Sequence, residues 1–249
     1  MPEDRVVTAC VLIIGNEILS GRTQDVNLAY IAEALNERGV QVREARVIPD
    51  VEDVIVTTVN ECRTKFDHVF TTGGIGPTHD DITADCIAKA FGRALYPHPE
   101  IEALIRQREA PPEVMESRLR MARVPEGAEL IRNPFGPAGF QVDNVYVMAG
   151  IPRVMQEMLK TLLPTLEGSR PVRSRTVTAF VTESQVAGPL SALQDDHPEV
   201  DFGSYPFSRD GRYGTSLVVR GTDETLLDLM KTELAALVTA AGGELSEHL

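Results

Sequence analysis

The sequence contains no tryptophan, three cysteines and far fewer basic than acidic residues. Without tryptophan, ligand recognition depends little on large aromatic platforms. Cys10, Cys62 and Cys86 form no CxxC pair and are odd in number, so we expect three reduced core residues in a reducing cytoplasm. The five histidines show no HExxH or HxH spacing, and no GxSxG stretch is present. Zinc centres and nucleophile elbows of those types are therefore not expected.

The shortage of basic residues also argues against a nucleic-acid partner. The formal net charge is −13 and the sequence pI about 4.9, whereas binding a nucleic-acid backbone needs neutralising lysines and arginines. We expect no nucleic-acid partner, although a local basic pocket for a small phosphate ester stays open. No apolar run approaches the roughly 20 residues of a membrane span, and the opening MPEDRVV carries acids where a signal peptide needs basic residues. We expect no membrane association and a cytoplasmic location.

Strand and helix patterns alternate through the first part of the chain. The strands are expected at 6–14, 40–48 and 67–72, and the helices at 27–38, 52–66 and 82–91. Asn27 is a candidate cap for the first of these helices, and Gly39 is its stop. This alternation predicts a mostly parallel sheet wound on both faces.

The later part of the chain suggests a second domain. Residues 98–121 are expected to be helical, interrupted by Pro111-Pro112, and residues 128–152 to form a strand, a glycine–proline loop and another strand, before a closing helix. The stretch EGSRPVRSR (167–175) is typical of a joint. The elements expected after it are a strand at 176–181, a helix at 183–196, strands near 200–208 and 214–220, and a helix at 223–241. We therefore predict domains at 1–170 and 171–249, the second a small α+β sheet with helices on one face.

Ligands of parallel sheets bind beyond the carboxyl ends of the strands, so the turns after the strands are the candidate sites. One of them, TTGGIGPTHDDIT (71–83), has no Walker lysine, and His79 stands where a dinucleotide fingerprint has its third glycine. Its glycines still let backbone N–H groups approach an anion, and the helix that opens near Thr83 favours negative charge there. Asp80 and Asp81 then suit a divalent cation between carboxylate and phosphate; alternatively, Asp81 or Thr83 simply caps the helix.

Acids also follow the two earlier strands, because Glu17 lies in the first turn and Asp50 in the second. Clustered carboxylates at one edge can hold a metal, or one of them can act as general base for a metal-positioned water. Taken singly, each is as readily a solvated loop residue. The loop NPFGPAGF (133–140) is a second glycine- and proline-rich element, which either presents backbone amides to a ligand or is a tight connection.

Together, IGNEILSG, IPD, TTGGIGPTHDD, NPFGPAGF and MAGIP resemble the MoaB/Mog-type molybdopterin-binding domain, over about residues 5–168. The likeness is greatest to the N-terminal domain of the competence/damage-inducible protein A (CinA) family and to the corresponding domain beside eukaryotic FAD synthases. The tail, with GSYPFSRDGRYGTSLVVRG, is similar to the small KH-like domain that follows in that family. The resemblance implies a three-layer α/β/α domain followed by a small α+β domain.

The resemblance also implies a phosphate-bearing ligand, nucleotide or pterin, at these turns. Asp50 and Asp81 match acids that serve catalysis or ligand handling in Mog-type relatives. Asp80, Asp81 and Glu17 are the candidate ligands of a divalent metal (Mg²⁺, Mn²⁺ or Co²⁺). The expected phosphate-binding residues are Gly15, Asn16, Gly73, Gly74, Gly76, Pro77, Thr78, Asn133, Gly136, Ala138 and Gly139.

Ile75 stands where the Mog pattern has a threonine, which favours the CinA-like branch. That branch is linked to metal-dependent hydrolysis of ADP-ribose-like pyrophosphates, with FAD as another candidate. The chain stops at Leu249 without the deamidase domain of full-length CinA, so nicotinamide mononucleotide deamidation is not expected. Two alternatives stay open, namely molybdopterin binding or adenylylation in molybdenum cofactor synthesis, and a non-catalytic nucleotide-binding module.

The small domain raises the further idea of RNA binding, through its KH-like order and the GRYG stretch (211–214). KH domains use such a loop to join helices, whereas here it joins two expected strands. Residues 171–249 hold six basic and twelve acidic residues, a net charge of −6. We therefore expect no RNA binding, and instead an oligomer contact or a lid. For the whole protein we expect a homo-oligomer, dimer or trimer.

Overall fold

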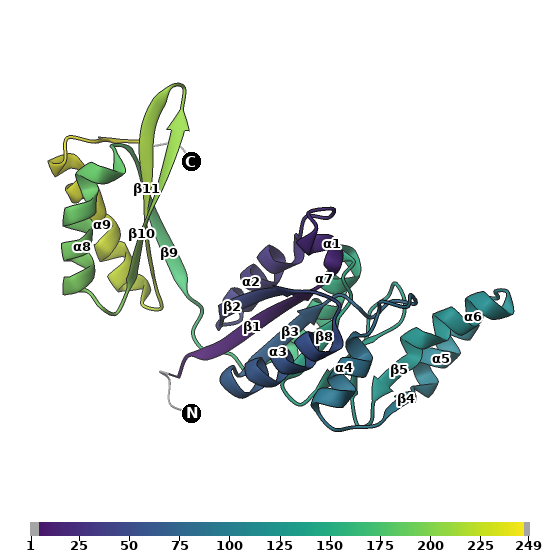
Figure 1. Ribbon diagram of the computed structural model, residues 1–249. Helices are drawn as coiled ribbons and strands as arrows, with labels where there is room; N and C mark the ends of the chain where they lie inside the picture. The colour runs from purple at the N-terminus through teal and green to yellow at the C-terminus, as the bar shows by residue number, and fades with distance from the viewer. Residues whose placement is uncertain (1–4, 247–249) are drawn as a thin grey trace. The chain divides into compact units, whose positions relative to one another are not determined.

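In the computed structural model, which describes residues 5–246, the chain divides into two units (Figure 1). The first unit ends at Ser169 and the second begins at Arg170. Each unit buries a hydrophobic core of its own. No helix between residues 5 and 246 combines the length and the apolar character that crossing a bilayer requires.

The apolar run near the N-terminus forms β1 (Val7–Ile14), the strand on which the first unit is built. Successive side chains of a strand point to opposite faces, and both faces of β1 are covered. Val7, Ala9, Val11 and Ile13 enter one core, while Cys10, Leu12 and Ile14 enter the other. A strand buried on both faces explains why the run is continuously apolar instead of alternating.

Six strands form the sheet of the first unit, in the order β2-β1-β3-β8-β7-β6. The members added to β1 are β2 (Val40–Ile48), β3 (His68–Thr72), β6 (Glu129–Ile131), β7 (Gly139–Val142) and β8 (Val145–Met148). β2, β1, β3 and β8 run parallel, whereas β7 is antiparallel to both of its neighbours. The expected mostly parallel sheet is therefore confirmed, with an antiparallel hairpin at one side.

Helices cover both faces of this sheet, which confirms the three-layer α/β/α architecture. On one face, α2 (Asn27–Glu37) and α7 (Pro152–Leu162) contribute buried side chains to the core that holds Val11. On the other face lie α3 (Glu52–Lys65) and α4 (Thr83–Ala90). The start of α2 differs from expectation: Asp25 Oδ1 accepts the hydrogen bond from Leu28 N, and Asn27 is already inside the helix.

Shorter elements complete the first unit. A helix, α1 (Asn16–Leu19), follows β1 directly, and a 3₁₀ turn at Leu163–Thr165 follows α7. After α4 the chain forms a helical excursion, seen at the right of Figure 1. In chain order it comprises β4 (Leu95–Pro97), α5 (Pro99–Arg106), α6 (Pro112–Leu119), a 3₁₀ turn (Arg120–Ala122) and β5 (Arg123–Pro125). Pro112 occupies the first turn of α6, where its missing N–H has no helical partner to lose.

The second unit is a four-stranded antiparallel sheet of order β10-β11-β9-β12. Its elements are β9 (Arg173–Phe180), α8 (Glu183–Asp196), β10 (Asp201–Arg209), β11 (Arg212–Gly221), α9 (Glu224–Ala240) and β12 (Glu244–Leu245). Both helices pack on one face, against side chains such as Val177 and Leu217, which confirms a small α+β domain. With β12 added, the order becomes the split β-α-β-β-α-β arrangement of ferredoxin-like folds. β10 is an edge strand and carries Pro206 near its centre, opposite Thr215.

Candidate functional site

The turns that follow the parallel strands meet at one edge of the sheet. Gly15 N donates to the carbonyl oxygen of Ile48 at 3.1 Å, and Gly73 N donates to that of Met148 at 3.2 Å. The backbones also approach closely, since a Cβ on Gly73 would lie 2.1 Å from the carbonyl oxygen of Ile14. The structure thus places the strand ends and their turns in direct contact at the carboxyl edge of the sheet, where ligands of open α/β sheets bind.

The glycine turn after β3 has a fixed conformation. Gly73 and Gly74 have φ values of 102° and 68°, in the left-handed region that favours glycine. Thr83, the fully buried first residue of α4, holds the turn at two points. Its N–H donates to the carbonyl oxygen of Gly74 and its hydroxyl to that of Gly73, each at 3.0 Å. The turn is therefore anchored to the start of α4.

This anchoring leaves consecutive backbone donors unused. Within residues 5–246, the N–H groups of Gly74, Ile75 and Gly76 donate no hydrogen bond. Successive free N–H groups in a turn form an anion-binding concavity, and the N-terminus of a following helix adds a favourable dipole. The backbone here is arranged to receive an anionic group such as a phosphate.

Asp80 and Asp81 converge on Thr78. The Thr78 hydroxyl oxygen lies 2.5 Å from both Asp80 Oδ1 and Asp81 Oδ2, and Thr78 N also donates to Asp81 Oδ2 at 2.8 Å. The hydrogen bond from Thr78, followed by that from its own backbone N–H, lowers the pKa of Asp80. Neither Asp81 nor Thr83 caps α4, whose N-cap is Ile82 without a side-chain hydrogen bond. The capping alternative for these two residues is therefore wrong.

One hydroxyl carries one hydrogen, so Thr78 can donate to only one of the two carboxylates. The second contact brings two oxygen atoms together with no proton between them, and a cation among the three oxygens would relieve it. Within residues 5–246, no three His, Cys, Asp or Glu side chains form a metal site by themselves, so Glu17 does not join Asp80 and Asp81 in one. Mg²⁺ commonly takes one or two carboxylates and completes its shell with substrate phosphates. The pair Asp80 and Asp81 fits that pattern.

Asp50 connects the turns after β1 and β2. Its Oδ2 accepts a hydrogen bond from Asn16 N at 2.8 Å, so the two predicted residues are brought together. Asp50 also affects α4: burial, with the nearby carboxylates of Glu52, Asp85 and Asp50, raises the pKa of the Cys86 thiol to about 12. Burial is the main cause of this shift, and Asp50 is the smallest contributor among the groups named.

The loop after β6 is organised by one side chain. Asn133 Oδ1 accepts hydrogen bonds from the N–H groups of Phe135 (2.9 Å) and Gly136 (3.1 Å), and its Nδ2 donates to the carbonyl oxygen of Pro137 at 3.0 Å. The Asn133 side chain and these two amides are thus engaged within the loop. Farther along, Gly139 has no room for a side chain, because a Cβ would lie 2.3 Å from the carbonyl oxygen of Val147.

Two depressions flank the glycine turn. One, of about 380 Å³ including space open to solvent, is lined by Glu17, Thr72, Gly73 and Asn27, among others. Asn27 was not recognised from the sequence as a residue of this edge. It is 4% exposed, and its Nδ2 donates to the carbonyl oxygen of Gly150 at 2.9 Å, tying α2 to the turn after β8.

The other depression, of about 330 Å³ including open space, collects Gly74, Gly76, Asp81 and Ala138 from the predicted set. Arg120 lines the same depression. No local motif marked Arg120, because only the return of the helical excursion brings it beside the glycine turn.

Fold and site together define an α/β domain in which free backbone donors and adjacent carboxylates lie at the carboxyl edge of a mostly parallel sheet. Residues 10–168 match the family model described as a probable molybdopterin binding domain, and the chain belongs to that family. Residues 171–242 match a second model, described as the middle domain of FAD synthase.

Individual relatives agree with this assignment. A protein of Archaeoglobus fulgidus is 34% identical over 79% of this chain and 84% of its own length. A CinA-like protein of Desulfosudis oleivorans is 35% identical over 78% of this chain and 50% of its own. The crystal structure of CinA from Thermoplasma acidophilum, described as of unknown function, is 34% identical. It covers 64% of this chain and 98% of its own chain, with a TM-score of 0.58.

These comparisons confirm the resemblance that the motifs suggested. The matched part spans half the length of CinA-like relatives such as that of Desulfosudis oleivorans. The activity of those longer proteins therefore enters only as a proposal.

Proposed function

We propose that the carboxyl edge binds a small phosphate-bearing ligand and, with a divalent metal, hydrolyses a nucleotide pyrophosphate such as ADP-ribose. The observation that carries this proposal is the run of three free backbone N–H groups at Gly74, Ile75 and Gly76. Free amides in a turn anchored to a helix suit a phosphate, and the two carboxylates beside them suit a metal bound through that phosphate.

Each residue has a definite task in this scheme. The amides of Gly74 to Gly76 hold one phosphate, and Thr78 orients the carboxylate of Asp81 toward the same depression. Asp50 uses Oδ2 to bind Asn16 N, which leaves Oδ1 to accept a proton from the attacking water. The water oxygen bonds to one phosphorus, the P–O–P bridge breaks, and two phosphomonoesters leave. When bound at Asp80 and Asp81, the metal neutralises charge on the phosphates.

The second candidate is molybdopterin binding or adenylylation, favoured by the family match over residues 10–168. Molybdopterin also presents a phosphate, so the amides of the glycine turn would serve it in the same way. The two candidates differ in what leaves the site, since hydrolysis of ADP-ribose yields AMP and ribose 5-phosphate, whereas pterin binding alone yields no nucleotide product.

The test is a screen of the purified protein against ADP-ribose, FAD and molybdopterin with Mg²⁺, Mn²⁺ or Co²⁺, with products identified by chromatography. We expect AMP from ADP-ribose, abolished by excess chelator. Hydrolysis that persists in chelator would contradict the metal-dependent step. Tight binding without any product would move the assignment to molybdopterin binding or to a non-catalytic nucleotide-binding module. Light scattering on the same sample tests the proposed dimer or trimer.

A further inference from the structure

We propose that Arg108, Arg118 and Arg120 form an anion subsite beside the glycine turn, which binds the second phosphate and the far end of an elongated nucleotide diphosphate ester. This "arginine pocket" also includes Met121 and Phe135. The inference rests on the proposed binding of a phosphate at the glycine turn, but it does not require that the ligand be hydrolysed.

The three arginines are notable for lacking acidic partners. Within residues 5–246, none of them takes part in an ion pair, although many other arginines of this acidic chain do. Arg123 illustrates the contrast, because it lies beside Arg120 in the same depression and makes a two-pronged contact with Asp85 at 2.9 and 3.2 Å. Arg120 therefore lies next to the glycine turn without an ion-pair partner of its own among the described residues.

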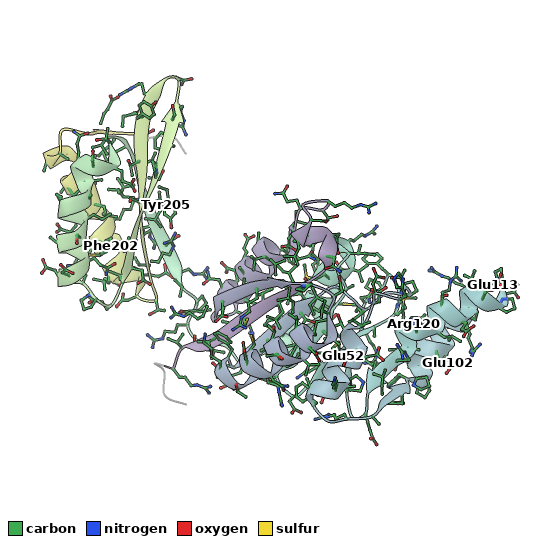
Figure 2. All side chains as sticks on the ribbon, in the orientation of Figure 1. Glu52, Glu102, Glu113, Arg120, Phe202 and Tyr205 are labelled. Atoms are coloured by element: carbon green, nitrogen blue, oxygen red, sulfur yellow. The ribbon has the colours of Figure 1, made fainter. Side chains whose placement is uncertain are left out.

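Arg120 also has no hydrogen-bond partner for its guanidinium donors in the described structure. Its Nε is buried and has no partner in the described structure, and its terminal nitrogens donate no hydrogen bond within residues 5–246. Figure 2 shows Arg120 at the end of α6 that adjoins the rest of the unit, with Glu113 at the far end of that helix. A guanidinium without protein partners can present its two terminal nitrogens as a pair, the geometry that matches two phosphate oxygens.

The concave surface continues from Arg120 to the other two arginines. The depression that holds Gly74 to Gly76 shares Met121 with a larger one of about 770 Å³, which includes space open to solvent. Arg108, Arg118 and Phe135 line the larger depression. Arg118 is oriented by a hydrogen bond from its Nη1 to the carbonyl oxygen of Arg108 at 3.4 Å.

The same surface has an apolar part, suited to a flat ring. Leu104, Ile105 and Met121 line it together with Phe135, and the Arg153 guanidinium lies 4.0 Å from the centre of the Phe135 ring. Phosphate oxygens near Arg120 and a ring or sugar near Phe135 describe one class of molecule, a nucleotide joined through two phosphates to a second group.

Like charges explain why a ligand would be favoured there. Arg108 and Arg118 line a depression that has no acidic lining residue, so their like charges repel each other, and a dianionic group placed between them and Arg120 reduces that repulsion. A ligand with a single phosphate satisfies the glycine turn alone, whereas one with two phosphates reaches Arg120 as well. The arginine pocket therefore discriminates by the number of phosphates.

The test compares Arg120→Gln and the double variant Arg118→Gln, Arg120→Gln with the control Arg43→Gln, in the full chain without metal. Arg43 is an exposed residue of β2 with no ion pair among the described residues, five positions before the strand's carboxyl end, and its substitution removes the same charge. The probes are AMP, with one phosphate, and ADP-ribose, with two, measured by calorimetry at two salt concentrations.

We expect Arg120→Gln to weaken ADP-ribose binding at least about 10-fold, as loss of a charge-assisted hydrogen bond does, and the double variant to weaken it further and to reduce its salt sensitivity. AMP binding should change much less, and Arg43→Gln should bind both probes normally. Equal losses for AMP and ADP-ribose, unchanged ADP-ribose binding, or no binding of either probe by the unmodified protein would each overturn the proposal. Arginine-dependent binding without hydrolysis would refute only the pyrophosphatase assignment.

Discussion

The substitution Gly74→Ala tests the glycine turn with the smallest available change. A Cβ at Gly74 would lie 2.1 Å from the hydroxyl oxygen of Thr83, and the residue has φ of 68°. The left-handed conformation costs an alanine about 1–2 kcal/mol. Displacing the Thr83 hydroxyl from the carbonyl oxygen of Gly73 adds about 1–3 kcal/mol, because both groups are then left unpaired inside the protein. The expected loss of stability is the sum, about 2–5 kcal/mol.

Gly92→Ala is the matched control for this loss. Gly92 has φ of 61°, but nothing lies within 4 Å of an added Cβ. Gly92 follows α4, whereas Gly74 precedes that helix. The substitution Gly92→Ala should therefore lower the unfolding free energy by only about 1–2 kcal/mol and leave ligand binding unchanged. Since the chain has no tryptophan, urea unfolding is best followed by circular dichroism. Equal losses for the two variants would refute the contact with Thr83 as the source of the extra cost.

Binding provides the second readout for Gly74→Ala. Domains are commonly stable by about 5–15 kcal/mol, so the variant should remain folded at 25 °C. Moving one N–H away from a phosphate removes a hydrogen bond worth about 1.5–3 kcal/mol, which corresponds to roughly 10- to 150-fold weaker binding of AMP or ADP-ribose. A folded Gly74→Ala protein with undiminished affinity would refute the phosphate cradle itself. Adding Thr83→Ala should cost less than the sum of the two single losses, because the clashing oxygen is gone.

Three further measurements address other parts of the molecule. Asp81→Asn should lower pyrophosphate hydrolysis by about 10²-fold or more while metal-free affinity holds or improves; unchanged turnover would remove Asp81 from catalysis. The Cys86 thiol has its pKa raised from 9.0 to about 12, so its neutral form stabilises the fold fully below pH 9, and that stability is lost as pH rises toward 12. Between pH 9 and 10, the unmodified protein should lose about 1 kcal/mol of unfolding free energy through this thiol, and Cys86→Ala should lack that loss; parallel pH curves for the two proteins would contradict this. Finally, fluorescence anisotropy with short single-stranded RNAs should show no binding tighter than the non-specific range of about 10⁻⁶ M at physiological salt; tighter, salt-sensitive binding would reverse our expectation for the second unit.

Local sequence patterns were sufficient for most helices and strands. β2 and α8 coincide with the ranges expected at 40–48 and 183–196. In both, a short-range rule describes the element: alternation for β2, and a capping box at Thr182 for α8. Such rules need no knowledge of distant residues, which is why they succeeded.

The β7–β8 hairpin shows where the sequence prediction failed for the fold. A single strand was expected after the loop at 133–140, yet the chain reverses between Val142 and Val145, with Asp143 at φ of 51°. The stretch FQVDNVYV contained the signal, an Asp-Asn pair between alternating apolar residues. The small elements β4, β5 and α1 had no comparable signal, because their lengths of three or four residues are set by the surrounding structure.

In the candidate site, too, some residues could be predicted from local sequence and others could not. The glycine turn and its acids are contiguous in sequence, so their grouping was foreseeable. Arg120 and Asn27 reach the same edge only through the excursion after α4 and through the hydrogen bond to Gly150. The residues near them at this edge lie far away along the chain, and no pattern within either segment could have indicated this proximity.

Pro206 has a consequence for self-association. β10 offers one side of its backbone to no other strand of the sheet, and an unpaired edge is a template on which a second chain can align. A proline in such a strand directs its donorless nitrogen away from its partner, so the outer row of hydrogen-bond donors is interrupted near its middle. A chain that aligned along β10 would lack a hydrogen-bond donor at this position. The proline therefore protects the second unit against cross-chain strand pairing and amyloid-like growth.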